Sequence, residues 1–190
     1  MSTIELTKFF CFKKARYSDL VSVLGMVACE DESARDALTF CLTGTRRNLV
    51  AWGHEYLRCL AGQIGAEYES KQEKEEDCDQ IIELVAQIIP EFINHNEEPE
   101  AVDLLLEVER LNKLIDHCTD KNFERVCRYL LSCAPYAPDT NEMLEHYNTA
   151  CNIYRKYKKF PEALRVAQKM NDMDIIGDLM EECTDKITLK

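Results

Sequence analysis

The sequence predicts an all-α fold in which antiparallel helical hairpins form a right-handed stack, an α-solenoid similar to tetratricopeptide or HEAT repeats. From Leu20 onward, apolar residues recur every three or four positions, which is the helix period. Only 6 Gly and 5 Pro occur, fewer than hairpin-rich sheets usually need. No stretch alternates apolar and polar residues as a strand does. We expect about eight or nine helices of ordinary length, joined by short loops.

We expect one helical-repeat domain over residues 16–190, preceded by a separate amino-terminal segment, residues 1–15. A length of 190 residues is enough for one domain with a sizeable core. Near the start of this domain, Ser33 and Asp36 fit a capping box that would begin a helix at ARDALTFCL. The acidic residues 67–79, EYESKQEKEEDCD, are expected to form a solvated loop or a helix start.

The stretch AWGHEYLRCLAG, residues 51–62, contains a His54–Glu55 pair that resembles the opening of a zinc-protease motif. That motif needs a second imidazole four residues later, and Arg58 stands there instead. A packing helix is the better interpretation, with His54 and Glu55 toward its rim and Gly53 allowing a neighbour to approach. One helical face would carry Trp52, Tyr56 and Cys59, and another Leu57, Leu60, Ala61 and Ile64.

Two further apolar stripes predict covered helices in the middle of the chain. The block PEAVDLLLEVERLNKLIDHC places Pro99 in a first turn, where proline is tolerated. A stripe this broad indicates a helix that is covered on more than one side. The first stripe consists of Cys78, Ile81, Ile82, Leu84, Val85, Ile88 and Ile89, and the second of Val102, Leu105, Val108, Leu111, Leu114 and Ile115.

The second half carries clear helix starts. Asp120 can cap NFERVCRYLLSCA, and Asp139 with Glu142 can cap the helix after the APYAPDT turn. Pro161 opens PEALRVAQKM, and Asp172 or Asn171 can cap the last helix. Helix pairs recur at about 35 to 40 residues, which is typical of helical-hairpin repeats. In a tetratricopeptide-like hairpin, we expect a crossing made by Tyr157, Phe160, Ala163 and Ala167.

Charge and hydropathy argue against several partners. The formal net charge of −12 argues against nucleic-acid binding, because an acidic chain repels phosphates. The longest apolar run, LVSVLGMVAC at residues 20–29, is too short to cross a bilayer, so no membrane association is expected. The first residues, MSTIELTKFFCFKKARY, do not have the pattern of a signal peptide. We therefore expect an intracellular protein.

Ten cysteines occur without any Cys-x-x-Cys pair. Free cysteine packs as a small apolar residue, so a core role is favoured over metal binding or redox chemistry. The cysteines that lie in phase with apolar neighbours are Cys78, Cys118, Cys127, Cys151 and Cys183.

No residue pattern predicts catalysis. Gly62 and Gly65 lie inside a helical pattern rather than in a phosphate loop, and no Gly-x-Ser-x-Gly elbow occurs. His117 and Cys118, with Cys127 and Cys133, match no common zinc spacing. Two other histidines, His95 and His146, are expected at the surface. We assign no catalytic residue, cofactor or metal, and we expect that the protein is not an enzyme.

A basic cluster lies near the end of one predicted helix, where cations suit the helix dipole. It could also dock an acidic partner. The cluster consists of Arg155, Lys156, Lys158 and Lys159.

Several passages together resemble one known family, that of the largest non-ATPase base subunit of the 26S proteasome regulatory particle. The first two are SVLGM at Ser22 and WGHEYLRCLAG. Three more follow in the family's order: IIPEFINHNEEPEAVDLLLEVERL at Ile88, VCRYLLSCAPYAP at Val126 and RKYKKFPEALRVAQKMNDMDIIGDLMEEC at Arg155. The resemblance covers most of residues 20–183, whereas residues 1–15 and 67–79 diverge from the family.

The resemblance implies a non-catalytic helical scaffold that contacts ATPase-ring subunits and other regulatory-particle subunits. The family protein is several times longer, and the repeat ring that binds ubiquitin follows the region seen here, so no ubiquitin-binding residue can be assigned. We keep two alternatives: an unrelated tetratricopeptide-like adaptor that binds a peptide or partner helix, and a zinc-dependent hydrolase built on His54, Glu55 and His117.

Overall fold

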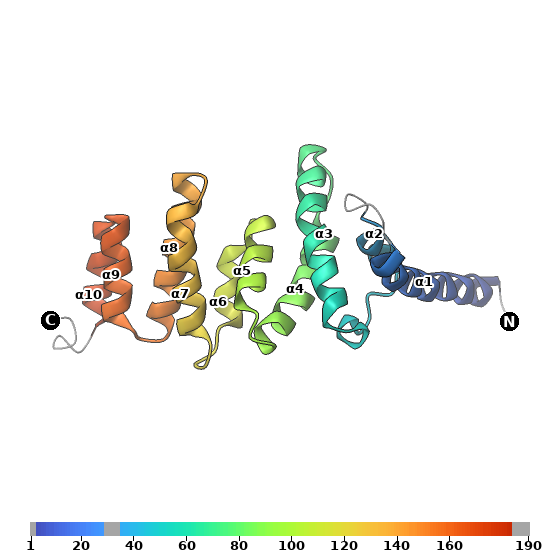
Figure 1. The fold of residues 1–190 in the computed structure, drawn as a ribbon, viewed down its shortest axis with the longest axis horizontal. Coiled ribbons are helices and arrows are strands. Elements are labelled where there is room, and N and C mark those ends of the chain that lie inside the picture. Colours follow the sequence, from blue (N-terminus) through green and yellow to red (C-terminus); the bar gives the residue numbers. More distant parts are fainter. Residues whose placement is uncertain (1–2, 29–34, 184–190) are drawn as a thin grey trace. The chain divides into compact units, whose positions relative to one another are not determined.

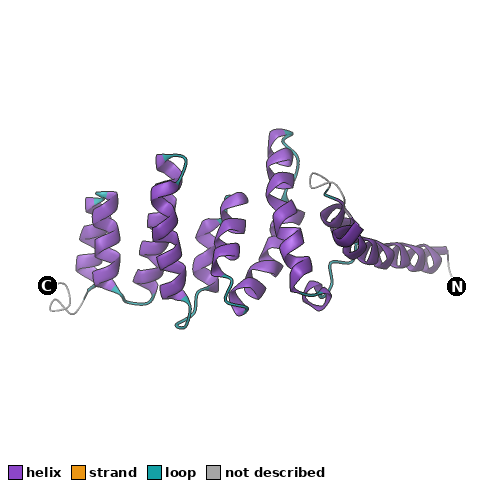
Figure 2. Ribbon diagram, in the orientation of Figure 1, coloured by secondary structure: helices purple, strands orange, loops and turns teal. Residues whose placement is uncertain are grey.

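A computed structural model describes the backbone of residues 3–28 and 35–183 and the side chains of residues 13–28 and 35–183. Within these ranges every regular element is a helix and no strand is present, which confirms the all-α prediction (Figure 2). The described residues form ten α-helices and three short 3-10 helices, more than the eight or nine expected. None of the described helices is both long enough and apolar enough to span a membrane.

The chain groups into two compact units, Met1–Glu91 and Phe92–Lys190. Residue 15, where we expected the repeat domain to begin after a divergent segment, lies inside helix α1. A single domain over residues 16–190 stays a prediction, and each unit is described by itself below.

The first unit contains α1 (Thr3–Ala28), α2 (Asp36–Thr43), the 3-10 helix η1 (Leu49–Trp52), α3 (His54–Glu73) and most of α4 (Asp79–Asn94) (Figure 1). Helices α1 and α2 form an antiparallel pair in close contact, and α3 contacts both. Ser33 lies outside the described residues. Helix α2 begins at Asp36 after Arg35, whose side chain makes no capping bond. The core of the unit includes Leu38, Leu57, Leu60, Ile64, Ile81, Leu84 and Ile88.

Polar contacts join α1 to its neighbours. The buried Ser22 hydroxyl donates to the Ala37 carbonyl at 2.5 Å, and its oxygen lies 2.6 Å from the Tyr56 hydroxyl. Since the Ser22 proton is directed to Ala37, Tyr56 donates to Ser22. About one helical turn before Ser22, Asp19 accepts from the Thr45 amide at 2.8 Å and from the Thr45 hydroxyl at 2.6 Å. These bonds connect three segments that are distant in sequence.

The start of α3 differs from our expectation. Trp52 ends η1 and is 37% exposed, so it does not share a helical face with buried Tyr56. Gly53 has φ +99°, a conformation that L side chains rarely adopt, and nothing lies within 4 Å of an added Cβ. Gly53 therefore serves a backbone bend and not the close approach we expected. Gly62 and Gly65 lie inside α3, as predicted.

The acidic stretch 67–79 is only partly a loop or helix start. Residues 67–73 form the last turns of α3, because buried Tyr68 continues the stripe of Leu57, Leu60 and Ile64. A turn follows, and α4 begins at Asp79. Cys78 lies in this turn and is half-buried, so its predicted place in the core stripe was wrong.

The second unit contains α5 (Glu98–Glu107), the 3-10 helix η2 (Leu111–Lys113), α6 (Leu114–His117), α7 (Phe123–Cys133), the 3-10 helix η3 (Ala134–Tyr136), α8 (Thr140–Lys156), α9 (Phe160–Met170) and α10 (Met173–Glu182). The block after Pro99 is interrupted at residues 108–110 instead of forming one helix. Its apolar residues remain buried, since Val102, Leu105, Val108, Leu111 and Leu114 are all at most 2% exposed.

Helix α9 contacts both α8 and α10 (Figure 1). Small side chains lie in the core between these helices. Ala163 and Ala167 are fully buried in this cluster, and Phe160 packs at its edge, as the hairpin pattern predicted. Tyr157 does not join this crossing, because its ring stacks on Phe123 of α7, with centroids 4.4 Å apart. The other buried members of the cluster are Ala134, Tyr147, Cys151, Val166 and Leu179.

Two of the predicted caps are confirmed and one is wrong. Asp139 accepts from the Glu142 amide at 2.7 Å, and Asp172 accepts from the Asp174 and Ile175 amides at 3.0 and 3.1 Å. Asp120 does not cap α7, whose preceding residue is Asn122. Pro99 and Pro161 occupy first-turn positions, as expected.

Five helices end in the same hydrogen-bonded turn without glycine. In each, a residue with φ between 53° and 60° donates to a carbonyl three residues earlier, and the next residue donates to a carbonyl five residues earlier. This is the Schellman arrangement, which satisfies the last carbonyls of a helix. The left-handed residues are Glu75, Asn96, Glu109, Lys158 and Asn171.

Candidate functional site

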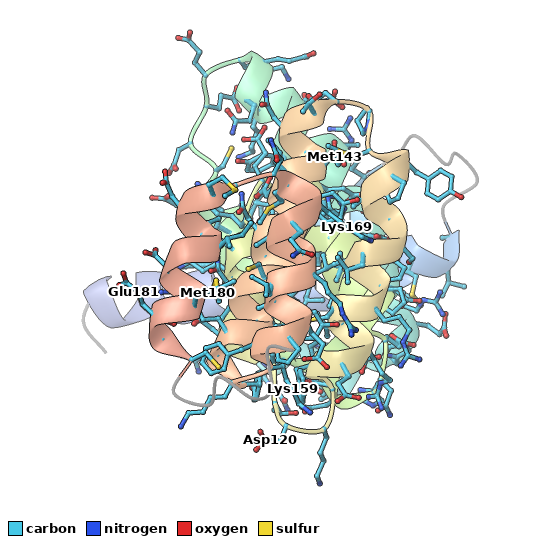
Figure 3. All side chains as sticks on the ribbon, turned by 90° about the vertical axis from the view of Figure 1, so that its left-hand side faces the viewer. Asp120, Met143, Lys159, Lys169, Met180 and Glu181 are labelled. Carbon is cyan, nitrogen blue, oxygen red and sulfur yellow. The ribbon has the colours of Figure 1, made fainter. Side chains whose placement is uncertain are left out.

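The predicted basic cluster lies where α8 ends and the chain turns into α9. Arg155 and Lys156 form the last turn of α8, Lys158 has φ 56° in the connecting turn, and Lys159 precedes α9. Figure 3 shows Lys159 toward the same end of the unit as Asp120. The four cations thus lie within five consecutive residues at the end of α8 and the turn into α9.

Three of these cations contact their own chain. The Arg155 guanidinium pairs with Glu182 of α10, and hydrogen bonding to Arg155 lowers the pKa of Glu182. Lys156 Nζ donates to the Ile115 carbonyl at 2.6 Å, and Lys159 Nζ lies 3.7 Å from a Glu124 carboxylate oxygen. The cluster thus connects α8 and its turn to α6, α7 and α10.

Aromatic contacts strengthen the same junction. Lys156 Nζ lies 5.6 Å from the centroid of the Tyr157 ring, and Lys159 Nζ lies 5.9 Å from that of Phe123. The Tyr157 hydroxyl donates to the Cys118 carbonyl at 2.5 Å. Cations over aromatic faces are favourable contacts. The basic cluster therefore has a packing role, while docking of an acidic partner stays a prediction.

A groove of about 470 Å³ opens beside the cluster, between α7, α8 and the start of α9. Two cations and two carboxylates line it, so it presents no single sign of charge. Half-buried Tyr154 forms part of the wall, and burial raises the pKa of its hydroxyl to about 12. The lining residues are Glu124, Arg128, Leu131, Ser132, Tyr154, Lys159 and Glu162.

A second groove in this unit, of about 430 Å³, lies beside η3. Tyr136 on its rim is 87% exposed, although large aromatic side chains are usually covered. Exposed tyrosines are common at protein interfaces. Sequence reasoning missed this feature, since it treated APYAPDT only as a turn. The lining residues are Leu106, Ser132, Cys133, Tyr136, Ala137, Glu142 and His146.

In the first unit, a cleft of about 420 Å³ lies between α1 and the segment that leads to α3. Asp19 in its wall is engaged with Thr45, as described above. Leu20 and Trp52 give the cleft an apolar side, and Arg16 and Arg47 give it cationic edges.

The residues considered for metal binding do not converge. In the described part of the chain, no group of three or more His, Cys, Asp or Glu side chains is placed to hold a metal ion. His54 and Glu55 begin α3, with His54 half-buried and Glu55 exposed. His117 ends α6, Cys127 lies in α7 and Cys133 ends α7, and burial lowers the pKa of His117.

The buried thiols are poor nucleophiles. Burial raises the pKa of Cys118 to about 11, and it raises the pKa values of Cys41, Cys127 and Cys151 as well. A thiol with a raised pKa remains protonated at neutral pH, whereas reactive cysteines have lowered values. The core role predicted for Cys118, Cys127, Cys151 and Cys183 is confirmed by their burial.

The two isolated histidines differ. His95 is exposed near the end of α4, as predicted. His146 is only 2% exposed, so its predicted surface position was wrong. Its Nδ1 lies 2.8 Å from the Glu142 carbonyl one turn earlier in α8, which satisfies the ring nitrogen inside the protein.

Comparison with known proteins places nearly all of the described region in one family. The profile of the RPN1 N-terminal domain matches residues 5–190. The chain is 40% identical over 168 residues to "26S proteasome non-ATPase regulatory subunit 2" of Dictyostelium discoideum, covering 88% of this chain and 18% of the relative.

Two other relatives give the same result. Identity to "26S proteasome non-ATPase regulatory subunit 2 homolog A" of Arabidopsis thaliana is 40% over 177 residues, covering 93% of this chain and 20% of the relative. Identity to "26S proteasome regulatory subunit rpn1" of Schizosaccharomyces pombe is 36% over 178 residues, covering 94% and 20%. The chain therefore spans about a fifth of the length of these relatives, and the alternative of an unrelated adaptor was wrong. This chain belongs to the RPN1 N-terminal domain family.

Proposed function

We propose that this chain is a non-catalytic scaffold in the base of the 26S proteasome regulatory particle, where it supports ubiquitin-dependent protein degradation through protein–protein contacts. The observation that carries the proposal is the family match over residues 5–190, together with relatives named as 26S proteasome regulatory subunits. Its partners would be ATPase-ring subunits and other regulatory-particle subunits, in the cytoplasm and the nucleus.

The side chains support a binding role more than a chemical one. The thiols with raised pKa values are buried, and the groove beside the basic cluster is lined by both cations and carboxylates. The described surface therefore favours contacts with macromolecules. Helical hairpins packed side by side offer extended surfaces instead of one closed pocket.

Co-purification tests the proposal. The chain is expressed with a cleavable tag in cells of its own source, and the eluate is analysed by quantitative mass spectrometry. We expect ATPase-ring subunits of the proteasome to be enriched at least tenfold over a tag-only control. Enrichment of other proteins without any proteasome subunit would contradict the proposal.

A second experiment separates the scaffold role from ubiquitin binding. The family's ubiquitin-binding ring lies outside the region this chain resembles, so we expect no saturable binding at micromolar concentrations. Titration of the chain into isotope-labelled ubiquitin, followed by NMR, measures this. Saturable shifts on the ubiquitin surface would show that the chain itself is a receptor.

A further inference from the structure

The outer face of α1 carries a row of exposed apolar side chains. Tyr17 is 66% exposed, Leu20 50%, Leu24 64% and Val27 75%. Single exposed apolar residues are common, but a continuous row of them along one helix marks an interaction site. In the first unit, this row is the longest apolar feature of the described helices that faces solvent.

The spacing of the row is that of a coiled-coil seam. Lys13, Tyr17, Leu20, Leu24 and Val27 follow each other at intervals of four, three, four and three residues. A repeat of this kind keeps one narrow stripe facing a partner helix, whose side chains fill the spaces between its members. The stripe therefore fits the apolar face of another α-helix.

The opposite face of α1 is already used. Ser22 is buried against α2 and α3, and an added Cβ at Gly25 would lie 3.4 Å from the Ala37 amide nitrogen. The outer stripe is thus held outward by contacts on the other side of the same helix. A binding partner would not have to displace α2 or α3.

Charge distinguishes the two ends of the stripe. Lys13, Lys14 and Arg16 are exposed at its amino-terminal end, beside the exposed Arg47 in the neighbouring segment. At the other end, the sequence from Leu20 to Ala28 contains no charged residue. This local excess of cations occurs in a chain of net charge −12, so it selects carboxylates on a partner.

We propose that the outer face of α1 binds one amphipathic α-helix of another protein, which has apolar residues at heptad spacing and Glu or Asp residues where it meets Lys13, Lys14 and Arg16. This inference depends only on the surface of α1, so it holds whether or not the chain joins a proteasome.

Two other occupants fit less well. A second copy packed in parallel on the same stripe would place the Lys13, Lys14 and Arg16 clusters against each other, which like charges oppose. Anionic lipid would attract these cations, but the net charge of −12 opposes approach of the chain to a negative surface.

Binding of a designed peptide tests the inference. The probe is a fluorescent three-heptad helix with Leu at both seam positions and Glu at the flanking positions, and its counterpart has Lys in place of Glu. Fluorescence anisotropy with the full chain should give at least tenfold tighter binding of the acidic peptide. Equal binding of both peptides, or no binding of either, would contradict the proposal.

Variants locate the site. Leu20→Glu with Leu24→Glu should weaken binding of the acidic peptide at least tenfold, and Lys13→Glu with Lys14→Glu should shift preference toward the basic peptide. Met173→Glu with Met180→Glu is the matched control, since these α10 side chains are 71% and 52% exposed. Circular dichroism verifies that each variant folds. Loss of binding in the control variant equal to that in the α1 variant would overturn the assignment to α1.

Two further measurements address the other occupants. The chain should be a monomer by light scattering and should not sediment with phosphatidylserine vesicles. If the chain dimerises or sediments with the vesicles, and the double variant Leu20→Glu with Leu24→Glu abolishes this behaviour, the proposal is overturned in favour of self-association or lipid binding.

Discussion

Where α1 of the first unit meets α2 and α3, a buried contact is a pair of hydroxyl groups, whereas α8 and α9 of the second unit meet through the methyl groups of alanines. Ser22 and Tyr56 form the first contact, and Ala163 and Ala167 the second. Hydroxyl pairs need correct bonding geometry, and small apolar residues need correct volume. The same helical architecture is thus held together by two kinds of specificity.

The comparison extends to the surface of each unit. The first unit leaves the apolar stripe of α1 in solvent, while the second unit encloses most of its apolar side chains and fixes its helix ends with Asp139 and Asp172. A unit with unpaired apolar surface is suited to recruit a partner, and a unit with closed packing and caps is suited to remain rigid.

The largest effect should come from overfilling the second unit. Ala167 has no exposed surface, so Ala167→Leu must push apart α8 and α9, and we expect a loss of about 3 kcal/mol in the free energy of unfolding. Urea unfolding followed by circular dichroism measures it. The neighbouring exposed Gln168→Leu is the control and should change stability by less than about 0.5 kcal/mol. Equal effects of the two variants would show that the crossing is loosely packed.

The hydroxyl pair of the first unit should give the next largest effect. Ser22→Ala removes the donor to the Ala37 carbonyl and the acceptor of Tyr56, so we expect a loss of about 2 kcal/mol. Tyr56→Phe should cost about 1 kcal/mol, and the double variant less than the sum of the two. Emission of Trp52, the single tryptophan, follows unfolding of this unit. Strictly additive costs would contradict the shared bond, and Tyr17→Phe on the exposed face serves as control.

The helix caps of the second unit should contribute less. Asp139→Ala and Asp172→Ala each remove a carboxylate that accepts from backbone amides, and each should cost about 1 kcal/mol. Asp120→Ala should change stability by less than about 0.5 kcal/mol, because Asp120 caps no helix. Thermal unfolding of the three variants provides the measurement. A loss of stability in Asp120→Ala as large as in Asp139→Ala would show that Asp120 stabilises the fold in a way other than helix capping.

Removing a glycine from inside a helix, and introducing one at a left-handed position, should each slightly stabilise the unit concerned. Gly62 lies inside α3 with nothing within 4 Å of an added Cβ, so Gly62→Ala should gain about 0.5–1 kcal/mol. Glu109 adopts φ 53° at the end of α5, and Glu109→Gly should gain a similar amount by relieving the left-handed conformation. Chemical unfolding tests both, with Lys113→Gly, outside any left-handed position, as a variant expected to lose stability.

The smallest effect concerns pH. Hydrogen bonding to Arg155 lowers the pKa of the Glu182 carboxyl in the folded chain below its ordinary value of 4.5. The pair therefore stabilises the fold above the unfolded-state pKa, and this stabilisation is lost as the pH falls through the lower folded value. The difference in melting temperature between the wild type and Arg155→Gln should shrink between pH 6 and pH 3. A constant difference would show that Arg155 acts through packing alone.

Sequence periodicity predicted the helical fold because burial selects apolar residues at the helix period regardless of neighbours. It failed at the turn after α5, where Glu109 adopts the left-handed conformation usually reserved for glycine. Lys158 adopts the same conformation after α8. Paired hydrogen bonds to the preceding helix offset the strain of the left-handed backbone, which is about 1 kcal/mol or more. No residue type in the local sequence predicts these bonds.

The candidate surfaces were less accessible from sequence. The basic cluster was visible, but its partners Glu124, Glu182 and the Ile115 carbonyl come from other helices. The sequence around His146 does not predict its burial, because its hydrogen-bond partner is a backbone carbonyl and not a particular side chain. The sequence shows the helical spacing of the apolar stripe on α1. Only the buried contacts of Ser22 show which face of this helix is exposed to solvent.

The buried cysteines have a consequence for handling the protein. Folding keeps the thiols of Cys41, Cys118, Cys127 and Cys151 protonated and away from oxidants. Once the chain opens, the same sulfurs regain ordinary acidity and can cross-link at random in air. Heating without a reductant should therefore become irreversible, and the apparent midpoint should depend on how quickly the sample is heated.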